Sequence, residues 1–208
     1  LCQEVADSVN REIVTALSEL LNEMVDDPNH ARSLDRLVNS IVQRFPLYKL
    51  ACVHLLQAGK LHCRAIARND DGTVEKELFD ASLQQGLLGK VCETGKTHCI
   101  RDLSKSSTTL PSIISEERLR SGMAVPLRIR RDIIGVLSVF TRYPLEFSTK
   151  HIAEINMLAN VAALEANNER QAEERRMMER VASEWQSATE RASTLSIIDD
   201  YACAIADS

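Results

Sequence analysis

Hydrophobic residues recur at two different spacings along the chain, and each spacing predicts its own kind of element. Over residues 1–25, and again over residues 34–45, apolar side chains return every three or four positions, as on one face of an amphipathic helix. Residues 26–29 interrupt this pattern, and Pro46 ends the second run because the residue before a proline is disfavoured in a helix. The N-terminal part of the chain therefore predicts two helices.

From residue 48 onward the spacing changes to two, which is typical of β-strands. Residues 48–56 and 61–68 predict a hairpin around the turn Ala58-Gly59, and residues 121–129 and 133–141 predict a second hairpin. Between the hairpins we expect a helix over 86–94, a strand near 97–101 and a loop over 103–116. From Phe147 to the end, no proline or glycine interrupts a predicted helix. Short connections between strands favour an antiparallel sheet flanked by helices, which is an α+β fold.

Residues 89–97, GKVCETGKT, are similar at first sight to a phosphate-binding loop. Such a loop has four residues between its glycines, follows a buried strand and opens a helix. Here five residues separate Gly89 from Gly95, and the β-like run His98-Cys99-Ile100 follows. We therefore exclude a nucleotide-hydrolase loop. The segment instead predicts a short helix that is capped by Gly95 and leads into a strand.

Composition and charge narrow the function classes. Hydrophobic residues make up 44% of the 208, aromatic residues only 4%, and the formal net charge is −5. No polybasic block is present, so neither nucleic acid nor an anionic membrane is expected as a partner. No apolar run approaches the roughly 20 residues that span a bilayer, and no signal peptide opens the chain. We expect a cytoplasmic protein. We also expect a piece of a longer one, because the chain begins without methionine and ends in predicted helix.

The six cysteines form no CxxC pair and match no zinc spacing, so we expect reduced structural thiols. One group remains open as a metal or redox site. If Ala58-Gly59 is the hairpin turn, His54 lies opposite Cys63, and Cys52 points the same way. Two thiols and an imidazole on one face can bind a soft metal or sense oxidants. Ordinary core packing among apolar neighbours is the alternative.

Four short motifs follow one another in a consistent order. The first is the pattern G-x-x-G-x-V-x-x-T-G over residues 86–95 together with the step Ile100-Arg101-Asp102 that follows it. Downstream come Val125-Pro126-Leu127, then IGVL over residues 134–137, and then Phe147-Ser148 at the start of the closing helix. This series resembles the GAF domain family, and the resemblance covers roughly residues 31–168.

The resemblance implies a ligand-sensing or dimerising module, often found in bacterial signalling proteins. It places the pocket between one sheet face and the helices and loops of the central segment. Family ligands include cyclic nucleotides, bilins, haem and small metabolites, and the cofactor of this chain is left unknown. A phosphodiesterase-type cyclic-nucleotide site is disfavoured, because His151 and Ile152 stand where F-x-x-x-D-E requires acids. A bilin is disfavoured because residues 103–120 hold neither cysteine nor histidine.

The family also contains an enzyme, the free methionine sulfoxide reductase, which uses redox cysteines. Aligning the Thr94-Gly95 step places the first of those cysteines at Leu88 in this chain, and the later one falls in a loop without cysteine. We therefore predict no catalytic residue and do not expect this chain to be an enzyme.

Basic side chains near the 103–116 loop suggest an anionic ligand, such as a carboxylate or an oxyanion, with the loop as its lid. The hairpin pattern puts Arg64 and Arg68 on the face opposite Cys63. A solvated surface is the alternative reading, since arginines are mostly exposed. The candidate ligand-binding residues are Arg64, His98, Arg101, Asp102, Thr108, Thr109, Arg120 and Met123.

The apolar positions of the closing helix continue beyond the domain. From Met177 to Ile205, eight steps cover 28 residues, a mean of 3.5, which is the spacing of a left-handed coiled coil. We predict three parts, an N-terminal signalling helix over 1–27, a GAF domain over 28–168 and an output helix over 169–208. A parallel homodimer would join through Val9, Ile13, Leu17, Val181, Trp185, Ala188, Leu195 and Ile198.

These features predict a regulatory sensory module. It would bind a small ligand and relay the event through a dimeric helix to an effector domain beyond residue 208. Two alternatives stay open: a ligand-free GAF dimerisation scaffold, and a cysteine or metal redox sensor.

Overall fold

The computed structural model of the chain describes residues 33–69, 81–82, 86–106 and 118–206. The predicted helix over residues 1–25, with Val9, Ile13 and Leu17, lies outside them. The chain divides into two compact units, Leu1–Asn167 and Asn168–Ser208, beside the predicted boundary at residue 168. Within the described residues, no helix combines the length and hydrophobicity that a membrane span requires.

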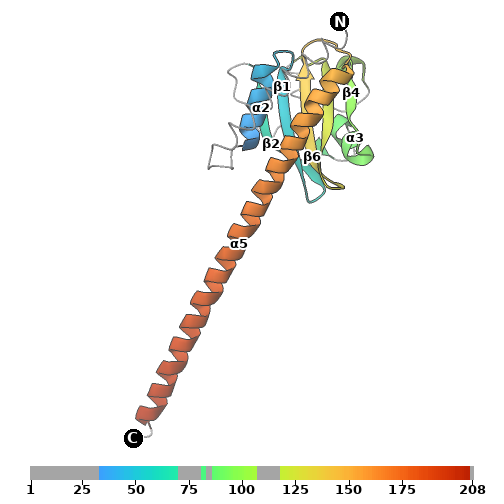
Figure 1. Cartoon of the computed structure of the whole chain (residues 1–208). Helices are drawn as coiled ribbons and strands as arrows, with labels where there is room; N and C mark the ends of the chain where they lie inside the picture. The colour runs from blue at the N-terminus through green and yellow to red at the C-terminus, as the bar shows by residue number, and fades with distance from the viewer. Residues whose placement is uncertain (1–32, 70–80, 83–85, 107–117, 207–208) are drawn as a thin grey trace. The chain divides into compact units, whose positions relative to one another are not determined.

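A single antiparallel sheet of six strands organises the first unit (Figure 1). Its strand order is β3-β2-β1-β6-β5-β4, so the two predicted hairpins lie side by side through β1 and β6. The predicted α+β class is confirmed. The strands are β1 (Leu50–Gln57), β2 (Lys60–Arg68), β3 (Ala81–Ser82), β4 (His98–Ile100), β5 (Ser121–Ile129) and β6 (Asp132–Thr141).

Helices cover the two faces of this sheet unequally. One face, called here the helix face, packs against α2 (Ser33–Arg44) and the first part of α5 (Thr149–Ala206). The other, called the α3 face, packs against α3 (Gly86–Thr94) and the short 3-10 helix η3 (Leu103–Lys105). Figure 1 shows α2 and the start of α5 crossing the same side of the sheet. The sheet residues of the helix-face core are Ala51, Val53, Ala65, Ala67, Met123, Val125, Leu127, Leu137 and Val139.

The first hairpin forms as predicted near its turn and departs from the prediction further along. Ala58 and Gly59 both have positive φ, as a two-residue hairpin turn requires, and His54 pairs with Cys63. Beyond this pair the register shifts by one, and Val53 pairs with Ala65. Arg64 is therefore the extra residue of a β-bulge. Because one extra residue exchanges the two faces, every later residue of β2 lies on the side opposite to the one predicted.

The GKVCETGKT segment forms the end of α3, a turn and the start of the edge strand β4. Gly95 has φ +65° and its N–H donates to the carbonyl of Val91 at 2.8 Å, as a glycine that terminates a helix does. The helix bounds, Gly86–Thr94, agree with the sequence prediction. The capping role predicted for Gly95 is confirmed.

Helix α5 begins at a reciprocal cap. The N–H of His151 donates to Ser148 Oγ at 3.3 Å, and the N–H of Ser148 donates to His151 Nδ1 at 3.2 Å. The first part of the helix then buries a stripe of mostly small residues, which lets its backbone approach the sheet closely. The stripe consists of Ile155, Leu158, Ala159, Ala162, Ala163 and Ala166.

Candidate functional site

The two faces of the sheet differ in chemistry at their centres. On the helix face, the core residues in the middle of β1, β2, β5 and β6 are aliphatic or methionine, and the buried hydroxyl residues Ser121 and Thr141 lie only at the strand ends. On the α3 face, His54, Ser138, Cys52 and Cys63 are buried, and the first three are no more than 2% exposed. Burying a polar group costs free energy unless it is hydrogen-bonded, so polar side chains concentrated on one face call for an explanation. The α3 face is therefore the candidate functional site.

Strand pairing brings the polar side chains into two adjacent rows. In antiparallel sheets, residues directly opposite one another share a face. One row runs across four strands through Cys52, Ser138, Ala124 and His98. The next row contains Cys63, His54 and Val136. Five strands thus supply one continuous strip in which imidazole, hydroxyl and thiol groups alternate with small or aliphatic side chains.

The electrostatics of the strip favour neutral thiols. Burial raises the pKa of Cys52 well above its usual value, and the neighbouring Cys63 raises it further, while the nearby Ser138 hydroxyl acts the other way. The Cys63 thiol lies 3.7 Å from the carbonyl oxygen of Ala65, to which it donates. Cys52 therefore offers a protonated, weakly polar S–H group instead of a reactive thiolate.

Arg68 also belongs to the α3 face, contrary to the sequence prediction. It pairs with Leu50, which lies in the α3-face core opposite Phe140. Sequence alternation had placed it on the other side, and the bulge at Arg64 reverses that placement. Sequence reasoning also missed Ser138, although a single hydroxyl within the apolar run of residues 133–140 was a visible signal.

The metal interpretation of Cys52, His54 and Cys63 gains no support from the geometry. In the part of the chain that the structure describes, no group of three His, Cys, Asp or Glu side chains is arranged to hold a metal ion. The predicted facing of His54 and Cys63 is nevertheless correct. The three residues share a face, where we expect them to act as hydrogen-bonding groups.

The structure disperses most of the predicted ligand-binding residues. Arg64 reaches Asp35 of α2, with 3.8 Å between the charged groups, and so lies on the helix face. Met123 is fully buried on the same face. Arg101 is exposed and forms an ion pair with Glu146 at 3.5 Å. Thr108 and Thr109 lie outside the described residues.

His98 is the predicted ligand residue that stays with the α3 face. It occupies the edge strand opposite Ala124, which lies in the α3-face core, and it is half-buried. Its Nε2 atom lies 2.8 Å from Thr94 Oγ1 at the end of α3. This contact places His98 at the rim of the strip, between α3 and the sheet.

Asp102 and Arg120 bind each other. The Arg120 Nε atom and one terminal nitrogen donate to Asp102 Oδ1 at 3.2 Å each, and the same terminal nitrogen donates to Oδ2 at 3.0 Å. Ser104 donates to Oδ1 through its N–H and its hydroxyl. These contacts, Arg120 first and Ser104 second, lower the pKa of Asp102 to about 2. The pair joins the residue before η3 to the residue before β5, and we call it the clasp.

We expect the clasp to make stability depend on acid pH. Because the pKa of Asp102 is lower in the folded protein, its contribution is complete above the unfolded value of about 3.9 and disappears as the pH falls through about 2. Urea unfolding should show that Asp102→Asn lowers the midpoint at pH 7 and that this difference shrinks between pH 4 and pH 2. Asp132→Asn, which removes an exposed carboxylate at the start of β6, controls for net charge. A difference that stays constant over this range would refute the role of ionised Asp102.

Comparison with known proteins identifies the family. The antiparallel sheet, with helices packed against each of its two faces, defines a small α+β domain. The family model described as GAF domain matches residues 31–165, so the chain belongs to the GAF domain family. GAF domains are generally sensory or regulatory modules. No curated protein matches the chain.

Solved structures share the fold at low sequence identity. The GAF domain of a phosphoenolpyruvate-protein phosphotransferase from Acinetobacter is 19% identical with a TM-score of 0.66, over 78% of this chain and 98% of that one. The corresponding Coxiella burnetii domain is 18% identical with a TM-score of 0.68, over 77% and 95%. Free methionine-R-sulfoxide reductase from Neisseria meningitidis, in complex with its substrate, is 17% identical with a TM-score of 0.65, over 77% and 91%. At these identities the likeness shows the fold alone.

Proposed function

We propose that this chain is a sensory GAF domain that binds a small, polar molecule on the α3 face and relays binding to an attached effector through α5. The observation that carries the proposal is the strip of buried polar side chains on that face, formed by His54, Ser138, Cys52 and Cys63. The opposite face is closed by α2 and α5 and is apolar at its centre. A ligand that hydrogen-bonds with the strip would account for this difference between the faces.

The raised pKa values of the cysteine thiols favour a binding role over a catalytic one. A catalytic cysteine needs an accessible thiolate, which a lowered pKa provides. In this chain, burial raises the pKa of Cys92 and of Cys99, as it does for Cys52. Cys92 lies on α3 and does not take the place of Leu88, where the reductase comparison would require a cysteine. We therefore retain the prediction of a non-catalytic module.

The second unit supplies the features of an output helix. Several large apolar side chains are exposed on it at helical spacing, among them Val181 at 46% and Trp185 at 72%. A helix with such a stripe and otherwise charged sides is stable when a second helix covers the stripe. We propose a second copy of the chain as that partner, joined in parallel through Val181, Trp185 and Ala188. The side chains of Leu195 and Ile198, also proposed for this seam, lie outside the described set.

A ligand-free dimerisation scaffold is the second candidate. It is favoured by the close packing of the α3 face, where other protein atoms fully bury Cys52, Leu61, Ala124 and Val136. In that case the polar strip would serve only the fold. The two candidates make opposite predictions for a chain purified from its own cells.

A matched pair of histidine variants tests the ligand proposal. His54 lies on the α3 face, whereas His62 pairs with Leu55, which packs against the helix-face core. Native mass spectrometry of the purified chain should show a bound small molecule in the wild type and in His62→Leu. In His54→Leu its occupancy should correspond to an affinity about 5- to 150-fold weaker, because a lost hydrogen bond to a buried group costs about 1–3 kcal/mol. Equal occupancy in all three proteins would exclude the α3 face as the site.

A further inference from the structure

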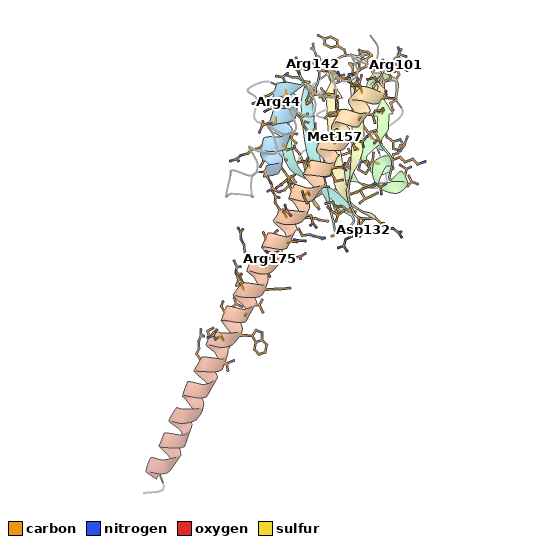
Figure 2. All side chains as sticks on the ribbon, viewed as in Figure 1. Arg44, Arg101, Asp132, Arg142, Met157 and Arg175 are labelled. Atoms are coloured by element: carbon orange, nitrogen blue, oxygen red, sulfur yellow. The ribbon has the colours of Figure 1, made fainter. Side chains whose placement is uncertain are left out.

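Three segments far apart in sequence meet at one end of the sheet. They are the end of β4 with η3, the start of β5, and residues 142–148, which connect β6 to α5 and are called here the connector. Figure 2 shows Arg101 and Arg142, from the first and last of these segments, at the same end of the domain. Leu103 N–H donates to the Arg120 carbonyl at 2.6 Å, and Arg120 N–H donates to the Thr141 carbonyl at 2.7 Å. Backbone hydrogen bonds thus run without a gap from η3 to the end of β6.

Ser121 lies at the centre of this meeting point. It is fully buried, and its hydroxyl lies 2.8 Å from the carbonyl oxygen of Arg101 and 2.7 Å from that of Tyr143. The same oxygen accepts the N–H of Leu145 at 2.6 Å. A hydroxyl carries one proton, so Ser121 can donate to only one of the two carbonyls at a time. The side chain therefore has two hydrogen-bonded arrangements, one toward β4 and one toward the connector.

The clasp joins this point to the α3 face. Asp102 and Arg120, which bind each other, are the neighbours in sequence of Leu103 and Ser121. Leu103 and Leu119 are both buried in the α3-face core with Leu87, Leu88 and Val91 of α3. Ser121 stands two positions before Met123 on the same side of β5, which is the helix face. One short stretch of chain thus contacts both faces of the sheet.

We infer that Asp102, Arg120 and Ser121 form a coupling junction that transmits a change in packing on the α3 face to the connector at the start of α5. A shift of Leu103 or Leu119 moves the clasp, and the clasp moves the strand end that carries Ser121. Ser121 then exchanges the Tyr143 carbonyl for that of Arg101, and the Tyr143 carbonyl keeps only the hydroxyl of Thr141 at 2.6 Å, so the connector is held less tightly. This is a local element with two arrangements, as transmission between two sites requires. The junction would transmit binding at the proposed site to the start of α5, and in that respect the inference rests on the proposed function.

A double-mutant cycle in the 208-residue chain tests the junction without any ligand. Leu119→Ala perturbs the α3 face, and Ser121→Ala removes the hydroxyl. Amide hydrogen exchange, followed by mass spectrometry, reports the connector. We expect Leu119→Ala alone to speed exchange over residues 143–150 about tenfold, and to add less than twofold when Ser121→Ala is already present. Ser138→Ala, an equally buried serine of the neighbouring strand, should leave the tenfold effect intact.

Two results would overturn the junction. One is an equal effect of Leu119→Ala with and without Ser121, which would mean that the two sites act independently. The other is faster exchange in α3 with no change in the connector. If Leu119→Ala does not fold, Leu119→Val gives a smaller perturbation and the same comparison of ratios. Because no ligand enters this experiment, failure of the junction is separate from failure of the ligand site, which the His54 and His62 variants test.

Discussion

Gly135→Ala should lower the free energy of unfolding by about 3 kcal/mol or more. Gly135 is buried in β6 next to β1, and a Cβ atom at this position would overlap the carbonyl oxygen of His54. The obstructing atom belongs to the backbone of a central strand, so no side-chain rotation relieves the clash. Urea unfolding followed by circular dichroism would measure the loss. Since His54 belongs to the polar strip, the same change should also disturb the site.

Gly59→Ala is the matched control for this prediction. Gly59 has φ +76°, and nothing lies within 4 Å of the Cβ that alanine would add. The substitution therefore costs only the strain of a left-handed backbone, about 1 kcal/mol. If the two alanine variants prove equally stable, strand β6 does not approach β1 as closely as the structure shows.

Val181→Glu should raise the dissociation constant of the dimer at least about 100-fold. The side chain is at the centre of the exposed apolar stripe and occurs twice in a dimer, so the variant loses two buried valines and gains two facing charges. Sedimentation equilibrium at several protein concentrations would measure the change. Ser183→Glu introduces the same charge two residues away, on the side of the same helix that faces away from the apolar stripe. This variant should leave the dissociation constant within a few-fold of the wild-type value. Monomeric wild-type protein at tens of micromolar would rule out the seam.

Local signals in the sequence were sufficient for most of the described elements, whereas the short strand β3 and the 3-10 helix η3, which falls within the predicted loop over 103–116, were not predicted. The bounds of α3 followed from Gly86 and Gly95, which start and end the helix and are close together in the chain. The second hairpin was equally accessible, since β5 spans the predicted residues 121–129 and β6 adds one residue to its prediction. The turn at Ala58-Gly59 fixed the pairing of His54 with Cys63. Short-range rules sufficed where the determining contacts are short-range.

The site was less accessible because it depends on contacts that alternation cannot report. No residue near Arg64, such as a glycine or proline, indicated a β-bulge in the sequence. This one extra residue places Arg68 on the α3 face. Asp102 and Arg120 were both expected to bind a ligand, yet they bind each other across 18 residues of sequence. Which charged groups pair is decided by the tertiary fold, and a list of basic residues contains no such information. Arg101 and Arg64, also expected at the ligand site, likewise pair with acidic residues, Glu146 and Asp35.

The central claim is that the α3 face holds a small molecule in a dimeric sensor. Native mass spectrometry of the wild-type chain from its own cells tests it most directly. The account predicts a complex that weighs more than two chains by a discrete small mass, and this excess should disappear when the protein is denatured. A complex whose mass equals that of its chains alone, in repeated preparations, would contradict the account and leave a scaffold without a ligand.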